Sequence, residues 1–173
     1  MNRKLRRIIP AAFLWILLLT GCQAIDDDRI PSMPVNIQFT NQGVWNAFGV
    51  SGYGMPRYFI LGNGIIEPAD FPYIYGSATG FGGVLLISGQ NPYTLDIGPL
   101  AYDLSCPVER DPNIRIYVDP ANFDGICPDC GSHYNVVEAG GTPISGPAKT
   151  LGYGLRMYKF YSTPNGGYLI SNF

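Results

Sequence analysis

Three cysteines in two proline-containing turns are the residues of this chain best suited to chemistry. Cys127 and Cys130 are separated by two residues in the turn at 127–132, and Cys106 lies upstream in the turn at 105–108. Cysteines at such spacings either ligate a metal ion or form a crosslink between loops. The two turns therefore predict either one metal site or one covalent bridge between them.

The residues around the cysteines do not predict a catalytic group. Ser132 is followed by His133, the only histidine of the chain, and no third member of a Ser-His-Asp triad stands nearby. The carboxylates that flank the turns are expected to form turns rather than an acid–base pair. They are Asp103, Glu109, Asp111, Asp119 and Asp124. We predict no catalytic residue, and the sequence favours a protein that is not an enzyme.

The chain begins with a predicted signal peptide, and the elements that position the cysteine turns come after it. Residues 1–21 combine a basic start with a short apolar run and end in Leu19-Thr20-Gly21, directly before Cys22. The apolar run is too short to span a bilayer, which takes roughly 20 residues. The ending resembles the bacterial lipobox, which implies that Cys22 receives a lipid anchor. Residues 22–33 are then a lipidated, acidic linker, similar to the export tag of surface lipoproteins in Bacteroidetes-type bacteria.

These features predict an outer-membrane lipoprotein that faces either the periplasm or the cell surface. The N-terminal lipid would hold it to the membrane. Without residues 1–21 the chain keeps 7 Lys and Arg against 13 Asp and Glu, a net charge of −6. A nucleic-acid partner would require a basic surface, so none is expected. An unknown protein partner is expected instead.

Residues 34–173 are predicted to form a single all-β domain. The 22 Gly and 15 Pro divide the chain into short pieces, and no segment after residue 30 shows a sustained helical period. Alternating or β-branched runs predict strands over 35–40, 83–88, 100–104, 114–118, 134–137, 154–161 and 167–171. The aromatic residues of 41–80 are expected to pack in the core and its loops. Short strands at regular spacing are typical of a sandwich or small barrel.

The two turns resemble the cluster loops of the Rieske [2Fe–2S] domain family. In that family the first loop reads Cys-x-His and the second reads Cys-x-x-His-Gly-Ser, which compare with residues 106–108 and 127–132 of this chain. The tail also matches, with an aromatic residue at Tyr134, a glycine pair at 140–141 and Gly-Pro-Ala at 146–148. The resemblance implies a Rieske-like antiparallel β-sandwich or small barrel with both cysteine loops at one tip.

This chain departs from the family at two of its four ligand positions. A Rieske centre binds one iron through two Cys and the other through two His. Val108 and Cys130 stand where the two histidines belong, and only one histidine is available in the whole chain. A standard Rieske cluster is therefore not expected. Residues Pro107, Pro128, Gly131 and Ser132 are expected to support the loops, with Ser132 donating hydrogen bonds near the site.

The resemblance leaves three uses for the thiols. The family's two Cys ligands share one iron, so Cys106 and Cys127 would face each other and could form a disulfide, closing a loop of about 20 residues. Cys127 and Cys130 could instead form a small redox ring. Alternatively, all three cysteines hold zinc or a modified iron–sulfur centre. The fourth ligand would then be His133, Asp129 or Glu109.

Two hypotheses about function follow. In the first, the chain is an envelope lipoprotein whose Rieske-like domain is a structural or interaction module, with a disulfide or a zinc ion stapling its loops. In the second, Cys106, Cys127 and Cys130 ligate a modified metal centre that transfers electrons. A thiol–disulfide protein using Cys127 and Cys130 is a weaker alternative, because no thioredoxin-like βαβ pattern accompanies them.

Overall fold

The computed structural model describes residues 24–62 and 64–173. The predicted signal peptide and Cys22 lie outside this part of the chain. Within it, no helix has the length and apolar character needed to cross a membrane.

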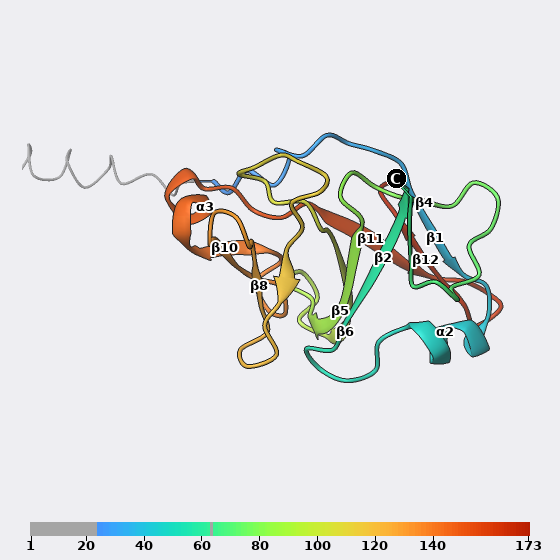
Figure 1. The fold of residues 1–173 in the computed structure, drawn as a ribbon. Helices are drawn as coiled ribbons and strands as arrows, with labels where there is room; N and C mark the ends of the chain where they lie inside the picture. Colours follow the sequence, from blue (N-terminus) through green and yellow to red (C-terminus); the bar gives the residue numbers. More distant parts are fainter. Residues whose placement is uncertain (1–23, 63) are drawn as a thin grey trace, which may run out of the picture.

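Eight strands form one antiparallel sheet that curls into a half-barrel (Figure 1). In spatial order they are β3 (Ile65–Glu67), β2 (Pro56–Gly62), β5 (Val84–Gln90), β6 (Ile97–Asp103), β11 (Met157–Ser162), β12 (Tyr168–Ser171), β1 (Val35–Phe39) and β4 (Ala78–Thr79). Strands distant in sequence are therefore neighbours in the sheet, and β11 joins the β5–β6 pair to the β12–β1 pair.

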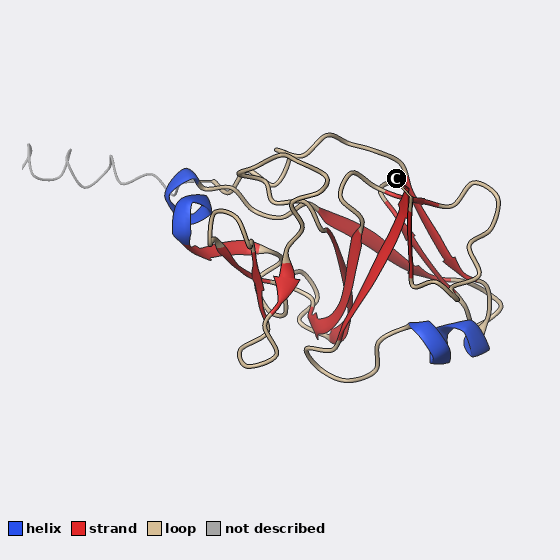
Figure 2. Ribbon diagram, viewed as in Figure 1, coloured by secondary structure: helices blue, strands red, loops and turns tan. Residues whose placement is uncertain are grey.

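A smaller antiparallel sheet carries the second cysteine turn, whereas the first follows β6 of the large sheet. Its order is β10 (Thr142–Ser145), β9 (His133–Asn135), β8 (Asp124–Ile126) and β7 (Tyr117–Val118). Helix α3 (Gly146–Leu151) follows β10 directly, and helix α2 (Gln42–Phe48) lies at the opposite end of the molecule (Figure 2). The second cysteine turn, residues 127–132, connects β8 to β9, so the register of this hairpin fixes where Cys127 and Cys130 lie.

Strand β5 holds the two parts of the core together. Val84 and Leu86 point into one hydrophobic cluster, whereas Leu85 and Ile87 point into another, and all four are fully buried. Successive side chains of a strand face opposite sides of the sheet, so a strand covered on both faces must be a continuous apolar run. The cluster that contains Leu85 and Ile87 also contains Cys106 and Cys127.

The second cluster is aromatic. Phe39 of β1 makes edge-to-face contacts with Trp45 and Phe71, at ring-centroid distances of 5.0 and 5.3 Å. Trp45 is presented by α2, which begins after Asn41, whose side-chain oxygen accepts a hydrogen bond from the backbone of Val44 at 3.1 Å. The expectation that most aromatic residues of 41–80 pack in the core is therefore confirmed for these residues.

The prediction of an all-β fold is confirmed, but several elements differ from those predicted. The run at 114–118 forms a strand only at its last two residues, because Ile114 and Ile116 bond the backbone of Cys106 and Leu104 in the first cysteine turn. Strands β2, β3, β4, β8 and β10 were not predicted. Neither were the two short helices, which lack the length over which a helical period becomes visible.

Candidate metal centre

The same backbone turn occurs twice and places the first cysteine of each loop. The carbonyl of Cys106 accepts a hydrogen bond from the N–H of Arg110 at 2.9 Å, and that of Cys127 accepts one from Gly131 at 3.1 Å. Arg110 and Gly131 both adopt left-handed backbone, with φ of 55° and 65°. In both turns a proline follows the cysteine, so the loops are two copies of one local design.

The two turns bring the three cysteine sulfurs together. All three Sγ atoms lie within 4.8 Å of one another, and those of Cys106 and Cys130 are 3.7 Å apart. Cys106 and Cys127 are fully buried, whereas Cys130 is half-buried. All three are free thiols, so neither the predicted Cys106–Cys127 disulfide nor a Cys127–Cys130 ring is formed in this structure. The structure thus assembles the predicted group of cysteines without a covalent bridge.

Polar groups surround the sulfurs on several sides. The Tyr134 hydroxyl lies 3.5 Å from the Cys106 sulfur, and the Ser132 hydroxyl lies 3.1 Å from the Cys130 sulfur. The backbone of Cys130 and Asp129 lowers the pKa of the Cys127 thiol through hydrogen bonding. Such donors stabilise a thiolate, because each can form a hydrogen bond with the negatively charged sulfur.

Burial acts in the opposite direction on the same thiols. It raises the pKa of Cys127 to about 12, although the backbone N–H groups of Cys130 and Asp129 partly oppose the shift. Burial also raises the pKa of Cys130, and hydrogen bonds with the side chain and backbone of Ser132 only partly oppose this. The thiols of Cys127 and Cys130 are therefore protonated at neutral pH unless a cation replaces their protons. A bound metal ion supplies that positive charge.

The residues predicted to support the loops have distinct roles. Pro107 is buried under the first turn and Pro128 is exposed, while Gly131 supplies the left-handed residue of the second turn. Ser132 is fully buried, and its hydroxyl oxygen accepts a hydrogen bond from the Ala148 N–H at 3.0 Å. This bond ties α3 to the second turn.

Gly146 explains the close approach of the Gly-Pro-Ala segment. Its φ is +75°, and an added Cβ would lie 2.7 Å from the Cα of Ser132. Only glycine fits this backbone conformation at this distance. The segment after β10 can therefore pack directly against the second cysteine turn.

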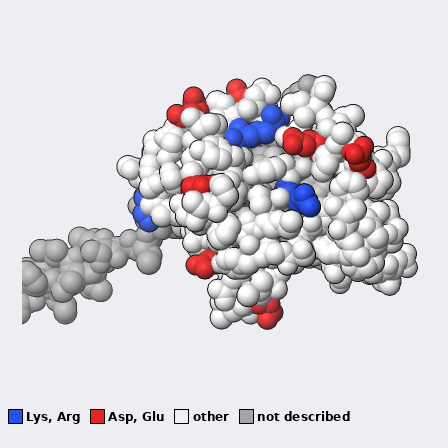
Figure 3. Space-filling view, turned by 60° about the horizontal axis from the view of Figure 1, so that its bottom comes forward, with Lys and Arg blue, Asp and Glu red and all other residues white. Residues whose placement is uncertain are grey.

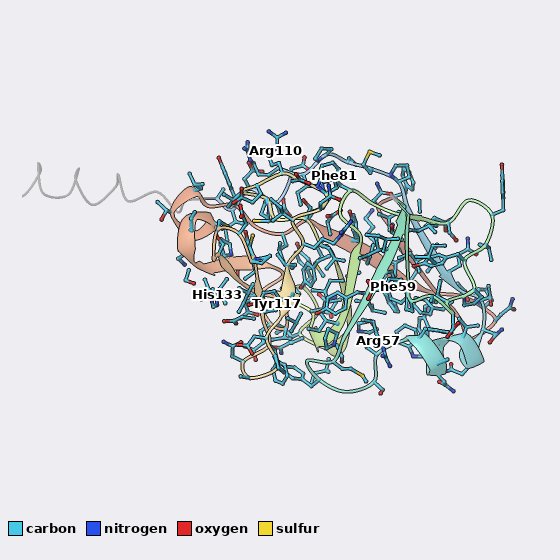
Figure 4. All side chains as sticks on the ribbon, viewed as in Figure 1. Arg57, Phe59, Phe81, Arg110, Tyr117 and His133 are labelled. Carbon is cyan, nitrogen blue, oxygen red and sulfur yellow. The ribbon has the colours of Figure 1, made fainter. Side chains whose placement is uncertain are left out.

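The lone histidine does not contact the three sulfurs in this structure. His133 Nδ1 lies 3.2 Å from a carboxylate oxygen of Asp124 on the neighbouring strand, and Figure 4 labels His133 and Tyr117, which lie on the two strands flanking β8. The strand alternates, so Tyr134 reaches Cys106 while His133 faces the other side. Glu109 and Asp129 also lie outside the 4.8 Å group.

Asp103 is an important residue whose role was not predicted. Its carboxylate is fully buried and accepts hydrogen bonds from the N–H groups of Phe81, Gly82 and Ser105, at 3.0, 3.0 and 2.7 Å, and from the Tyr158 hydroxyl. It thereby fixes the chain immediately before Cys106. From the sequence we expected only a turn former at this position, because sequence position does not reveal whether a carboxylate is buried.

Comparison of the chain with protein-family models, with curated proteins and with solved structures finds no match.

Proposed function

We propose that this chain is an envelope lipoprotein whose Rieske-like β domain has lost two-histidine cluster ligation and acts as a structural or interaction module. In this proposal a zinc ion held by Cys106, Cys127 and Cys130 staples the two cysteine turns together. A standard [2Fe–2S] Rieske centre does not fit the chain, because Val108 and Cys130 occupy the two histidine positions of the resembled motif.

The observation that carries the proposal is the spacing of the sulfurs. Zinc binds thiolates at about 2.3 Å in tetrahedral geometry, which requires sulfurs roughly 3.8 Å apart. The Cys106 and Cys130 sulfurs are 3.7 Å apart, and the third sulfur lies within 4.8 Å of both. A disulfide would need the two sulfurs at about 2.05 Å. The spacing therefore favours a shared metal ion over a covalent bond.

The repeated turn suggests Glu109 as the fourth ligand. Each turn runs from its cysteine to a left-handed residue, so Glu109 in the first turn corresponds to Cys130 in the second. Glu109 is half-buried, and its side chain would rotate toward the sulfurs when a metal binds. A set of three thiolates and one carboxylate is compatible with zinc, which accepts sulfur and oxygen ligands.

A test of this proposal measures metal and acid-labile sulfide per chain in protein purified without oxygen, together with its visible spectrum. We expect one zinc per chain, no sulfide and no visible absorbance. Cys130→Ser should lower zinc affinity by at least about tenfold, because it removes one of three thiolates. The matched control is Ser145→Ala, which changes a nearby hydroxyl that caps nothing in α3 and should leave zinc affinity unchanged.

Glu109 provides a second, independent test. Glu109→Cys should complete four thiolates and tighten zinc binding, whereas Glu109→Gln should weaken it. If neither substitution changes the affinity, Glu109 is not a ligand. The three-cysteine site would then be completed by another group.

An electron-transfer protein with a modified iron–sulfur centre is the second candidate function. The hydrogen-bonding groups around the sulfurs favour it, because hydrogen bonds to sulfur and solvent exposure set the reduction potential of such clusters. Tyr134 and Ser132 supply two of these groups, and half-buried Cys130 gives the site an exposed side. Iron and sulfide in equal amounts, with visible absorbance, would replace the zinc proposal with this one.

The proposal includes attachment of the protein to the outer membrane by a lipid on Cys22. The lipobox-like ending before Cys22 supports a lipid anchor, and the acidic residues after it support export to the outer membrane. Mass spectrometry of the protein from membranes tests this directly. A lipid-modified N-terminal Cys22 is the expected result, and Cys22→Ser should release the protein from the membrane fraction.

A further inference from the structure

The eight-stranded sheet opens between β6 and β11. These strands pair only at Met157 with Tyr102 and at Tyr158 with Ala101. Beyond this point β6 stays paired with β5, and β11 turns to pair with β12 instead. Figure 2 shows β11 running across the direction of β5 and β6 rather than alongside them. One sheet is thus held by two residue pairs at its centre.

Pro99 explains why the pairing stops. The N–H of Asp103 bonds the carbonyl of Arg156 at 2.9 Å, so every second residue of β6 points its backbone groups toward β11. The next such positions after Ala101 are Pro99 and then Ile97. Proline has no N–H to donate, so the ladder cannot continue through Pro99 to its would-be partner, Phe160.

A cleft of about 570 Å³ occupies this opening. We call it the β6/β11 cleft. Consecutive residues of β11 line it, from Met157 to Tyr161, although neighbouring side chains of a strand face opposite sides of a sheet. The cleft therefore lies in the plane of the sheet, between two strands. The β5–β6 hairpin and the N-terminal segment complete its walls.

Backbone groups on both walls lack partners. By the same alternation, Phe160 on β11 and Pro99 on β6 direct their backbone groups into the cleft. Ser162 and Ile97 continue the same two strand edges just beyond the residues that line it. No hydrogen bond to these groups occurs among residues 24–62 and 64–173. Such edges pair readily with another extended chain. Here two edges face the same space, so an incoming segment would find donors and acceptors on both sides.

The side chains of the cleft add charge and aromatic surface. Asp27 and Asp96 line it, together with a single cation, Lys159. Neither carboxylate forms an ion pair within the described part of the chain. The ring of Tyr93 also lines the cleft and is 83% exposed. Two carboxylates beside an exposed aromatic ring favour a positively charged side chain.

We propose that the β6/β11 cleft binds an extended peptide segment of a partner protein that carries a lysine or arginine. The segment pairs through its backbone with Phe160, Ser162 and Ile97. Its basic side chain lies against Asp27, Asp96 and the Tyr93 ring. This site is separate from the three cysteines, and it supplies the partner surface that an interaction module requires.

The test uses purified protein and a capped hexapeptide of alternating valine and threonine with one central lysine. We expect saturable binding below about 1 mM by nuclear magnetic resonance titration. The amides of Ile97, Phe160 and Ser162 should become protected from hydrogen exchange on binding. Replacing lysine by glutamate in the peptide should weaken binding about three- to tenfold.

Two controls separate backbone pairing from charge attraction. A peptide with N-methylated backbone keeps its charge but cannot pair, and it should not bind. Asp96→Asn should weaken binding of the lysine peptide and should not weaken binding of the glutamate peptide. The proposal is overturned by no saturable binding, by binding without protection of the three amides, or by equal binding of the N-methylated peptide. Protection of those amides by self-association alone would assign the cleft to a second copy of this chain and would also overturn it.

The peptide-binding test does not depend on whether the three cysteines bind a metal ion. Zinc content and peptide binding are measured separately, and Cys130→Ser should leave peptide affinity unchanged.

Discussion

The two ends of strand β6 are built in opposite ways. At its C-terminal end, buried Asp103 accepts four hydrogen bonds and fixes the backbone that leads to Cys106. At its N-terminal end, Pro99 lines an opening in which the backbone of Phe160 on β11 has no partner on β6. One strand thus joins a hydrogen-bonded end, next to Cys106, to an open end at the β6/β11 cleft. We call these the closed end and the open end of β6.

This contrast indicates how the fold could separate two roles. A metal site needs ligands held in place before the ion arrives, and the bonds of Asp103 and Ser132 provide that order. A peptide site instead needs unpaired backbone and space. On the face shown in Figure 3, the Lys and Arg side chains are interspersed with Asp and Glu, so charge alone does not single out either end.

Metal removal should produce the largest effect, and only at the closed end. If the ion is present at about a thousand times its dissociation constant, its loss lowers the free energy of unfolding by about 4 kcal/mol. Hydrogen exchange should then speed up in 105–110 and 127–132. Exchange in 97–99 and 159–162 should stay as fast as before. Equal changes in exchange rate at both ends of β6, or no change at either, would contradict the proposed difference between the two ends.

Asp103→Ala should be the most damaging single substitution. It leaves three buried N–H groups and the Tyr158 hydroxyl without their acceptor, which should cost about 3 kcal/mol or more. The matched change at the open end is Asp96→Ala, expected within about 0.5 kcal/mol of wild type because its carboxylate makes no such bonds. Urea denaturation measures both. Similar losses for the two variants would contradict the account.

The charge of Asp103 gives a related pH dependence. Burial raises the pKa of Asp103 above its ordinary value of 3.8, although its four hydrogen bonds oppose this. The folded state then keeps the proton to higher pH than the unfolded state. The free energy of unfolding should therefore fall as pH rises from 3.8 through the raised pKa. Asp103→Asn should lack this slope, and an unchanged slope in that variant would assign it to another group.

Substitutions at two glycines should have an effect on stability of intermediate size. A Cβ on Gly82 would lie 2.5 Å from the backbone nitrogen of Ser105, whereas a Cβ on Gly98 would meet nothing within 4 Å. Gly82→Ala should destabilise the protein by about 2 kcal/mol, because backbone must move next to Cys106. Gly98→Ala should have little effect. Thermal unfolding of both variants is the measurement, and the reverse order would show that the open end is the more tightly packed.

The smallest predicted effect is a gain in stability at the open end. Pro99→Val restores an N–H that can bond the carbonyl of Phe160 and extend the β6–β11 ladder. One added hydrogen bond should stabilise the protein by about 1 kcal/mol. The same change should close the cleft and reduce binding of the lysine peptide. A variant that gains stability without losing peptide binding would argue against the cleft as the peptide site.

The fold class and the cysteine group could be predicted because both depend on local sequence. Residues 84–87 of the strand predicted over 83–88 are wholly apolar, and three cysteines in two Pro turns indicate a shared site. The role of Asp103 could not be predicted, since it depends on donors from Phe81, Gly82 and Tyr158, which are distant in sequence. The cleft was missed for the same reason: Pro99 matters only because β11 is its neighbour.

The resemblance to the Rieske family stays a prediction, and the chain allows it to be tested. Val108→His combined with Cys130→His would restore both histidines of the resembled motif beside Cys106 and Cys127. If the loops have the Rieske arrangement, the double variant should bind iron and sulfide and become coloured. A colourless double variant that still folds would argue against that arrangement.

The most direct test of the central claim is X-ray absorption at the metal edge of the protein purified without oxygen. We predict one zinc per chain, with three sulfur neighbours at about 2.3 Å and one lighter ligand at about 2.0–2.2 Å. Zinc without sulfur neighbours, or iron with sulfide in its place, would contradict the claim that Cys106, Cys127 and Cys130 hold a structural zinc ion.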